Sequence, residues 1–112
     1  STRFTTYEKS EIDLIVKKRN GNLEEFQYEK LFSGVENAFG GQELSDKKLK
    51  NLVETIYLEL KKHGKKIESN IIGETVLSHL KDINEVAYLR FASVYKEFSA
   101  VSDFEKEAAE LN

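Results

Sequence analysis

From about residue 28 to the C-terminal end, apolar side chains recur every three or four residues, a spacing typical of α-helices that bury one face. Residues that start or stop helices divide this pattern into five segments: Gly40-Gly41, Ser45, Gly64, Ser69, Asn84, and Ser102 or Asp103. The fourth segment carries Ala87, Phe91, Val94 and Phe98 in line, and the last carries Phe104, Ala108 and Leu111. The sequence therefore predicts a bundle of four to five helices.

The segment before these helices alternates apolar and polar residues. Ile12, Leu14 and Val16 fall on one face of a predicted strand. Asn20-Gly21-Asn22 predicts a tight reversal, because Asn and Gly tolerate a positive φ, and residues 23–26 form the returning strand. Since two strands alone are marginal in water, the hairpin must lie against the helices. The predicted fold class is α+β, with a small N-terminal β-hairpin packed on the helical bundle.

Composition excludes several classes of protein. A chain of 112 residues with 39% hydrophobic and 33% charged side chains suits one globular domain. The chain has no cysteine, which excludes a disulfide framework and a cysteine metal site within it. No apolar run approaches the roughly 20 residues of a membrane span, so no membrane partner is expected. The net charge of −3 argues against binding nucleic acid by charge alone.

Catalytic motifs are also missing from the sequence. We find no phosphate-binding loop, no dinucleotide fingerprint and no H-E-x-x-H zinc motif. His63 and His79 are 16 residues apart on predicted helix surfaces, where an ordinary surface histidine is the better interpretation than a metal ligand or a general base. The sequence therefore predicts that the chain is not an enzyme.

A basic cluster stands out against the acidic background. Lys17-Lys18-Arg19 ends the first predicted strand, and Lys30 opens the first predicted helix. A hairpin folded on that helix brings Lys18 near Lys30, and ammonium groups beside a helix start suit a polyphosphate. The alternative is a solvated strand end, because lysine pairs also occur at 47–48, 61–62 and 65–66.

The second feature is an aromatic run in the fourth predicted helix, residues 86–95. Tyr88 and Tyr95 are seven residues apart and so share one face, while Arg90 lies off it. A tyrosine there can stack on a purine while its hydroxyl finds a polar partner. Ordinary core packing with the hydroxyls in water is the competing interpretation.

Several of these residues also carry a resemblance to known families. The first third of the chain resembles the opening of an ATP-cone, a nucleotide-sensing domain. The residues that carry this resemblance are Val16, Lys18-Arg19-Asn20-Gly21, Glu24-x-Phe26 and Glu29-Lys30-Leu31. The run from Glu85 to Tyr95, with Phe98 following, resembles the signature of the NrdR family, bacterial repressors of ribonucleotide reductase genes. The lead Arg3-Phe4-Thr5-Thr6-Tyr7-Glu8 resembles the last segment of that family's N-terminal zinc ribbon. The implied division is residues 1–10 as the tail of a ribbon and 11–112 as the ATP-cone.

The resemblance also implies a ligand and the residues that bind it. The expected ligands are ATP and dATP, and whether Mg²⁺ accompanies them stays open. Lys18 and Lys30 are expected to hold the phosphates, with Arg19 adjacent. Val16 would lie against the nucleotide, Glu24 would contact the sugar or base, and Tyr95 would line the pocket. Glu25 stands where the family commonly has a proline, a departure that bears on the affinity more than on the function.

The expected partners follow from the same resemblance. Nucleotide exchange would control a homo-oligomer of a cytoplasmic repressor. The family's ribbon binds zinc through four cysteines and contacts operator DNA, so both zinc and operator binding are expected of the full-length protein and not of this cysteine-free chain. Two alternatives stay open: the allosteric ATP-cone of a ribonucleotide reductase, and a helical protein-interaction domain without nucleotide.

Overall fold

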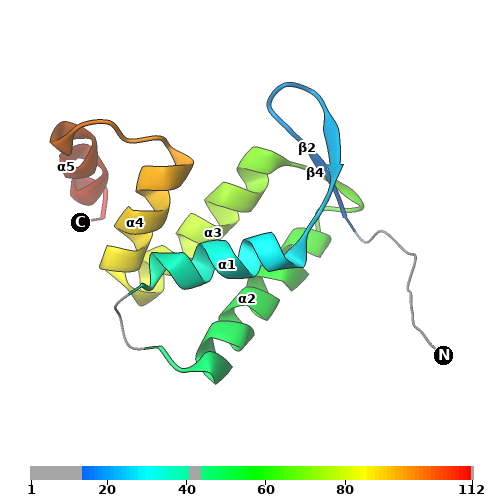
Figure 1. The fold of residues 1–112 in the computed structure, drawn as a ribbon, viewed down its shortest axis with the longest axis horizontal. Coiled ribbons are helices and arrows are strands. Elements are labelled where there is room, and N and C mark those ends of the chain that lie inside the picture. Colours follow the sequence, from blue (N-terminus) through cyan, green and yellow to red (C-terminus); the bar gives the residue numbers. More distant parts are fainter. Residues whose placement is uncertain (1–13, 41–43, 112) are drawn as a thin grey trace.

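The computed structural model describes residues 14–40 and 44–111, and its strands and helices form an α+β fold. In chain order the elements are β2 (Ile15–Lys17), β3 (Leu23–Glu25), α1 (Tyr28–Ala38), α2 (Asp46–Lys61), β4 (Lys66–Glu68), α3 (Ser69–Ile83), α4 (Glu85–Tyr95) and α5 (Val101–Ala109). The strands stand at one end of the helices, and α5 lies on the outer side of α4, away from the hairpin (Figure 1). The predicted ribbon tail, residues 1–10, and Ile12 of the predicted first strand lie outside the described residues.

Within the described residues, three strands form the sheet, one more than the sequence predicted. The order is β3-β2-β4, with β2 antiparallel to β3 and parallel to β4. Val16 lies opposite Glu24 on one side and opposite Ile67 on the other. The short strand β4 was missed because only its central residue, Ile67, is apolar, and three residues are too few to display an alternating pattern. Its pairing with β2 arises from tertiary structure.

The predicted reversal between β2 and β3 is confirmed. Gly21 has a φ of 88°, the left-handed region that glycine adopts without steric cost. The amide of Lys18 donates to the carbonyl of Asn22 at 2.8 Å, and the amide of Asn22 donates to the side chain of Asn20 at 2.9 Å. Strand β3 ends at Glu25, one residue before the predicted end. These bonds fix where Lys18 leaves the hairpin.

The boundaries of α2 and α4 follow the predicted capping residues, whereas α5 begins at Val101, before the predicted start at Ser102 or Asp103. The Ser45 hydroxyl accepts from the amide of Lys48 at 3.2 Å and caps α2. Gly64 follows the end of α2 with a φ of 103°. The Asn84 side chain accepts from the amide of Ala87 at 3.0 Å and caps α4.

The core lies between the sheet and helices α1 to α4 and contains most of the expected apolar residues. Phe104, predicted on the apolar stripe of the last helix, is instead 41% exposed. Val35, Val53, Ile56, Leu60, Val76, Leu80, Ala87 and Ala92 are fully buried. Val94, predicted to share a stripe with Ala87 and Phe91, is instead 80% exposed. Helix α4 ends at Tyr95, and Glu97 takes a positive φ of 56°, so Phe98 lies outside the helix whose stripe it was predicted to extend. No described helix combines the length and the apolar character needed to cross a membrane.

Helix α5 is held to α4 through a buried polar cluster. Glu107 is the buried residue of α5 and is only 5% exposed. Its carboxylate accepts from the Tyr88 hydroxyl and from Lys96 Nζ at 3.0 and 3.1 Å. We call Tyr88, Lys96 and Glu107 the docking cluster. The predicted apolar stripe of the last helix did not indicate a buried glutamate.

Candidate functional site

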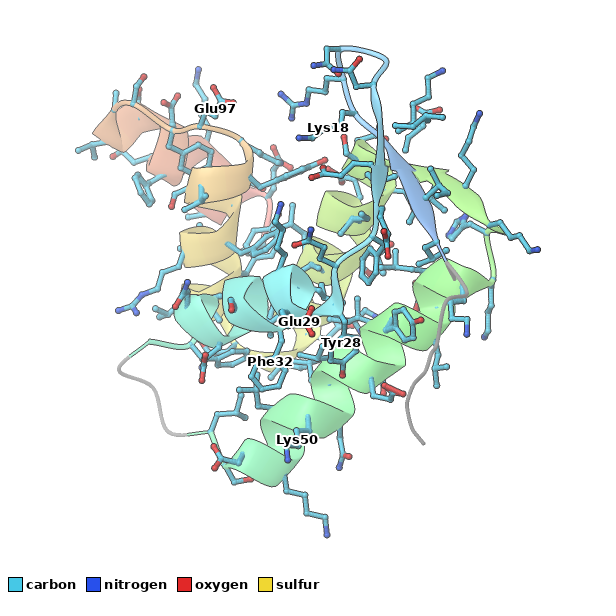
Figure 2. All side chains as sticks on the ribbon, turned by 45° about the vertical axis from the view of Figure 1, so that its right-hand side comes forward. Lys18, Tyr28, Glu29, Phe32, Lys50 and Glu97 are labelled. Carbon is cyan, nitrogen blue, oxygen red and sulfur yellow. The ribbon has the colours of Figure 1, made fainter. Side chains whose placement is uncertain are left out.

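A cavity of about 240 Å³ opens beneath the β-hairpin, between the hairpin and helices α1, α3 and α4. Its floor is apolar and draws on all of these elements: Val16, Phe26, Leu31, Ile72, Val76 and Phe91. Its polar lining includes Lys18, Glu24 and Lys30, which we call the cavity cluster. Figure 2 shows Lys18 on the hairpin, with Tyr28 and Glu29 at the start of α1 below it. An apolar floor with cations beside it suits a ligand that has one flat apolar part and one anionic part.

Aromatic packing fixes the start of α1 and therefore the position of Lys30. The Phe26 ring stacks on the Tyr57 ring of α2, with centroids 5.6 Å apart. The Tyr28 ring meets the same Tyr57 ring edge-on, at 5.4 Å. These contacts anchor both sides of Gln27, the N-cap residue of α1, and Gln27 itself lines the cavity. Lys30 thus projects from the first turn of a helix whose N-terminal end favours anions.

The two lysines predicted to bind phosphate share one carboxylate. Glu24 Oε2 lies 3.1 Å from Lys18 Nζ, and Glu24 Oε1 lies 3.5 Å from Lys30 Nζ. The hydrogen bond from Lys18, helped by the charges of both lysines, holds the pKa of Glu24 below its ordinary value. With two cations and one anion, the cavity cluster has a net positive charge at neutral pH. The hairpin and α1 therefore bring Lys18 and Lys30 to one place, as the hairpin argument anticipated.

Arg19 and Tyr95 lie beside the cavity and are not among its lining residues. The Tyr95 hydroxyl donates to the carbonyl of Asn70 at 3.1 Å. Burial raises the pKa of that hydroxyl, nearby Glu74 adds to the effect, and the Arg19 guanidinium opposes it. Arg19, at the hairpin turn, therefore lies near the Tyr95 hydroxyl. Of the six residues singled out in the sequence, Val16, Lys18, Glu24 and Lys30 line the cavity, and Arg19 and Tyr95 form a neighbouring pair.

Tyr95 is connected to the cavity through Phe91 and packs closely on α3 at Gly73. Its ring stacks on Phe91 with centroids 6.1 Å apart, and Phe91 lines the cavity. On α3, the ring lies so close to Gly73 that a methyl group added there would overlap it. The absence of a side chain at position 73 thus lets α3 and α4 approach around Tyr95.

Except for Val16, the apolar floor of the cavity was not predicted as part of a site. Phe91 and Val76 lie on helical stripes that the sequence analysis interpreted as ordinary core. A stripe of this kind indicates which residues face inward, but it carries no information on whether the interior is filled. The residues were identified correctly as inward-facing, and the space beside them needed the tertiary structure.

The two histidines form no metal site among the described residues. His79 Nε2 lies 2.9 Å from Glu59 Oε1, which links α3 to α2. Within residues 14–40 and 44–111, no group of three or more histidine, aspartate or glutamate side chains gathers in a position to hold a metal ion.

Comparison with known proteins adds a family to this geometry. The model of the ATP cone domain matches residues 14–101. A protein of Corynebacterium kroppenstedtii named "Transcriptional repressor NrdR" is 48% identical over 110 residues, which cover 97% of this chain and 72% of that protein. Proteins of the same name from Corynebacterium jeikeium and Synechococcus sp. are 47% and 46% identical, covering 98% of this chain and 67% and 70% of their own lengths.

Proposed function

Because the chain belongs to the NrdR family of transcriptional repressors and contains an ATP cone domain, we propose that its cavity is the site at which such a repressor senses ATP and dATP. The chain is a regulator and not an enzyme, in keeping with relatives that are named as repressors. The repressor names also favour this function over the allosteric domain of a reductase. In this proposal residues 11–112 form the nucleotide-binding domain.

One observation carries the proposal: lysines from two separate elements meet beside an apolar cavity. Lys18 leaves the hairpin and Lys30 leaves α1, and both contact the same carboxylate, so both ammonium groups can reach one anion. The phosphates would form ion pairs with these two ammonium groups, and the adenine would lie on the apolar floor against Val16. Glu24 would contact the sugar or base. This division matches a nucleotide, which has a flat base at one end and phosphates at the other.

Arg19 and Tyr95 complete the proposed site from its edge. Arg19 is a further cation on the hairpin and would add to the attraction for phosphate. Tyr95 would contribute through its stacking on Phe91. A divalent cation such as Mg²⁺ would accompany the phosphates as a part of the ligand, since the described residues hold no metal cluster of their own.

The regulatory consequence needs no bond to be broken. ATP and dATP differ by one hydroxyl group, and a ligand shifts an equilibrium only by its differential affinity for the two states. Exchange between them would therefore change the oligomeric assembly of the repressor in the cytoplasm. Operator binding and zinc would belong to a ribbon of the full-length protein, because this chain has no cysteine.

A thermal melt of the 112-residue chain, with and without saturating ATP or dATP, tests the proposal. A ligand at about 100 times its dissociation constant adds about 2.7 kcal/mol to the free energy of unfolding. For a domain of this size we expect the Tm to rise by roughly 10 °C. Lys30→Ala should abolish most of this rise.

Lys50→Ala is the matched control for the melt. Lys50 is an exposed lysine on α2, on the side away from the hairpin (Figure 2), and its removal changes the net charge by the same amount. We expect this variant to keep the full rise. An equal rise in the Lys30→Ala variant, or no rise with either nucleotide in the unmodified chain, would contradict the proposal.

A further inference from the structure

Glu24 is the only acidic side chain that pairs with both lysines among the described residues, and each of its oxygens is used by a different one. Oε2 contacts Lys18 at 3.1 Å, and Oε1 contacts Lys30 at 3.5 Å. A carboxylate held in this way presents two negative oxygens to two ammonium groups. A phosphate group would present the same arrangement to them. The carboxylate therefore stands at the place where an incoming phosphate would neutralise the same cations.

We propose that Glu24 is an internal competitor for the phosphate site, whose carboxylate must leave Lys18 and Lys30 before a phosphate group can bind them. This inference rests on the proposed function, and it adds a means by which the site sets its own affinity. Every phosphate that binds replaces two existing ion pairs, so the net free energy of binding is less favourable than two unpaired lysines would give. Removal of the Glu24 charge should then strengthen phosphate binding.

The exposure of the cluster makes such an exchange feasible. The side chains of Lys18, Glu24 and Lys30 are 50%, 33% and 68% exposed. Ion pairs that remain in contact with water are individually weak and break readily. The lysines also hold the pKa of Glu24 below its ordinary value, so the carboxylate is charged at neutral pH and competes in full.

Release of Glu24 would also change the contact between two elements. Glu24 lies on β3 and Lys30 on α1, so their ion pair joins the hairpin to the helix. The contact with Lys18, in contrast, stays within the hairpin. A phosphate that captures Lys30 removes the first contact and takes its place as the link to α1. Glu24 is then free to turn to the sugar or base.

Glu24→Gln tests the inference, with Glu25→Gln as its matched control. Both variants remove one negative charge from the same strand, and Glu25 also lines the cavity. We would measure the binding of inorganic tripolyphosphate by titration calorimetry, because this probe has no sugar or base for Glu24 to contact. Glu24→Gln should bind it about three- to tenfold more tightly than the unmodified chain, as expected when two exposed pairs no longer compete. Glu25→Gln should gain by a clearly smaller factor, because Glu25 forms no ion pair with Lys18 or Lys30 and only its solvent-screened charge is lost.

Three results would overturn the inference: an unchanged or weaker affinity in Glu24→Gln, an equal gain in Glu25→Gln, and no binding of tripolyphosphate to any of the three proteins. The proposed function has a separate test in the melts with ATP and dATP. A rise of Tm with ATP, without a gain in tripolyphosphate affinity in Glu24→Gln, would contradict the competing role of Glu24 and leave the proposed nucleotide sensing intact. A gain in tripolyphosphate affinity in Glu24→Gln, without any rise of Tm with ATP or dATP, would support the competing role of Glu24 and contradict the proposed nucleotide sensing. A melt of each variant without ligand checks that the fold is kept.

Discussion

The cavity cluster and the docking cluster have nearly the same chemistry, since each holds a glutamate against lysine. They differ in their surroundings. The Glu24 side chain is 33% exposed and makes one contact with each of two lysines that are at least half exposed. The Glu107 side chain is 6% exposed, and both of its oxygens accept from Lys96 while the Tyr88 hydroxyl adds a third hydrogen bond. The first carboxylate can exchange its partners with a ligand, and the second cannot do so while α5 stays in place.

Burial also changes the balance of forces on the two carboxylates. For Glu24, the hydrogen bond and charge of Lys18 lead the effects that lower its pKa. For Glu107, burial itself raises the pKa, and the hydrogen bonds from Tyr88 and Lys96 have to outweigh it, which they do. Burial also raises the pKa of Tyr88, with Glu107 adding to the rise, so the hydroxyl keeps its proton and donates it. The same residue types thus form the proposed ligand site in one place and a structural contact between α4 and α5 in the other.

The largest expected effect is on the structural contact between α4 and α5. Glu107→Ala leaves the Tyr88 hydroxyl and Lys96 without their buried acceptor, and we expect the free energy of unfolding to fall by about 2 kcal/mol. The cost is below that of a fully buried pair because Lys96 stays partly in water. The Tm should drop by roughly 10 °C. A thermal melt with Glu105→Ala, an exposed glutamate of the same helix, as the control should show a change of about 2 °C or less.

Tripolyphosphate binding by Glu107→Ala tests whether the cavity cluster is independent of the docking cluster. Below its own Tm, Glu107→Ala should bind this probe as the unmodified chain does, because α5 contributes nothing to the cavity. A drop in affinity together with stability would show that the two regions are coupled, and the contrast between them would fail.

An intermediate effect is expected from pH. The folded pKa of Glu107 lies below its ordinary value of 4.5, so its contribution to stability is complete above that pH and is lost as the pH falls through the folded value. The difference in stability between the unmodified chain and Glu107→Gln should therefore be largest near neutral pH and shrink below about pH 4.5. Urea midpoints at several pH values measure it. A difference that stays constant into acid would mean that the Glu107 charge has no part in holding α5.

The smallest effect on stability, with a large one on binding, is expected for Lys18→Ala. Lys18 is half exposed and pairs on the hairpin only with Glu24 among the described residues, so its removal should move the Tm by no more than about 2 °C. Tripolyphosphate binding should weaken by about tenfold, because one of the two phosphate cations is gone. Lys17→Ala is the adjacent control and should leave binding within about twofold. A loss of stability without a loss of binding would place Lys18 with the structural residues.

The sequence predicted those parts of the fold that depend on local chemistry. The hairpin turn follows from the tolerance of Gly21 for positive φ, and the start of α2 follows from the hydroxyl of Ser45. Strand β4 depends on pairing with β2, about 50 residues earlier in the chain, so no local signal predicted it. Local patterns also failed at the edge of the bundle, where Val94 is exposed and Glu107 is buried. Only the packing of α5 on α4 decides which face is covered there.

The candidate site divides in the same way. Lys18 and Lys30 could be paired from the sequence, since a hairpin must lie on the helix that follows it. Their shared contact with Glu24 depends on side-chain positions that no spacing encodes. The cavity floor and the separate pairing of Arg19 with Tyr95 required the arrangement of four elements in space. The roles of these residues toward a nucleotide remain predictions.

The close contact between Gly73 and Tyr95 restricts how this protein can vary. Any side chain at position 73 would enter the space of the Tyr95 ring, whereas a smaller residue at position 95 would vacate that space. In a library randomised at position 73 alone and selected for folded protein, the clones should therefore carry glycine. In a library randomised at both positions, alanine or serine at 73 should be recovered together with a small residue at 95. Substitutions at the two positions would therefore covary, although position 95 lies 22 residues after position 73 in the chain.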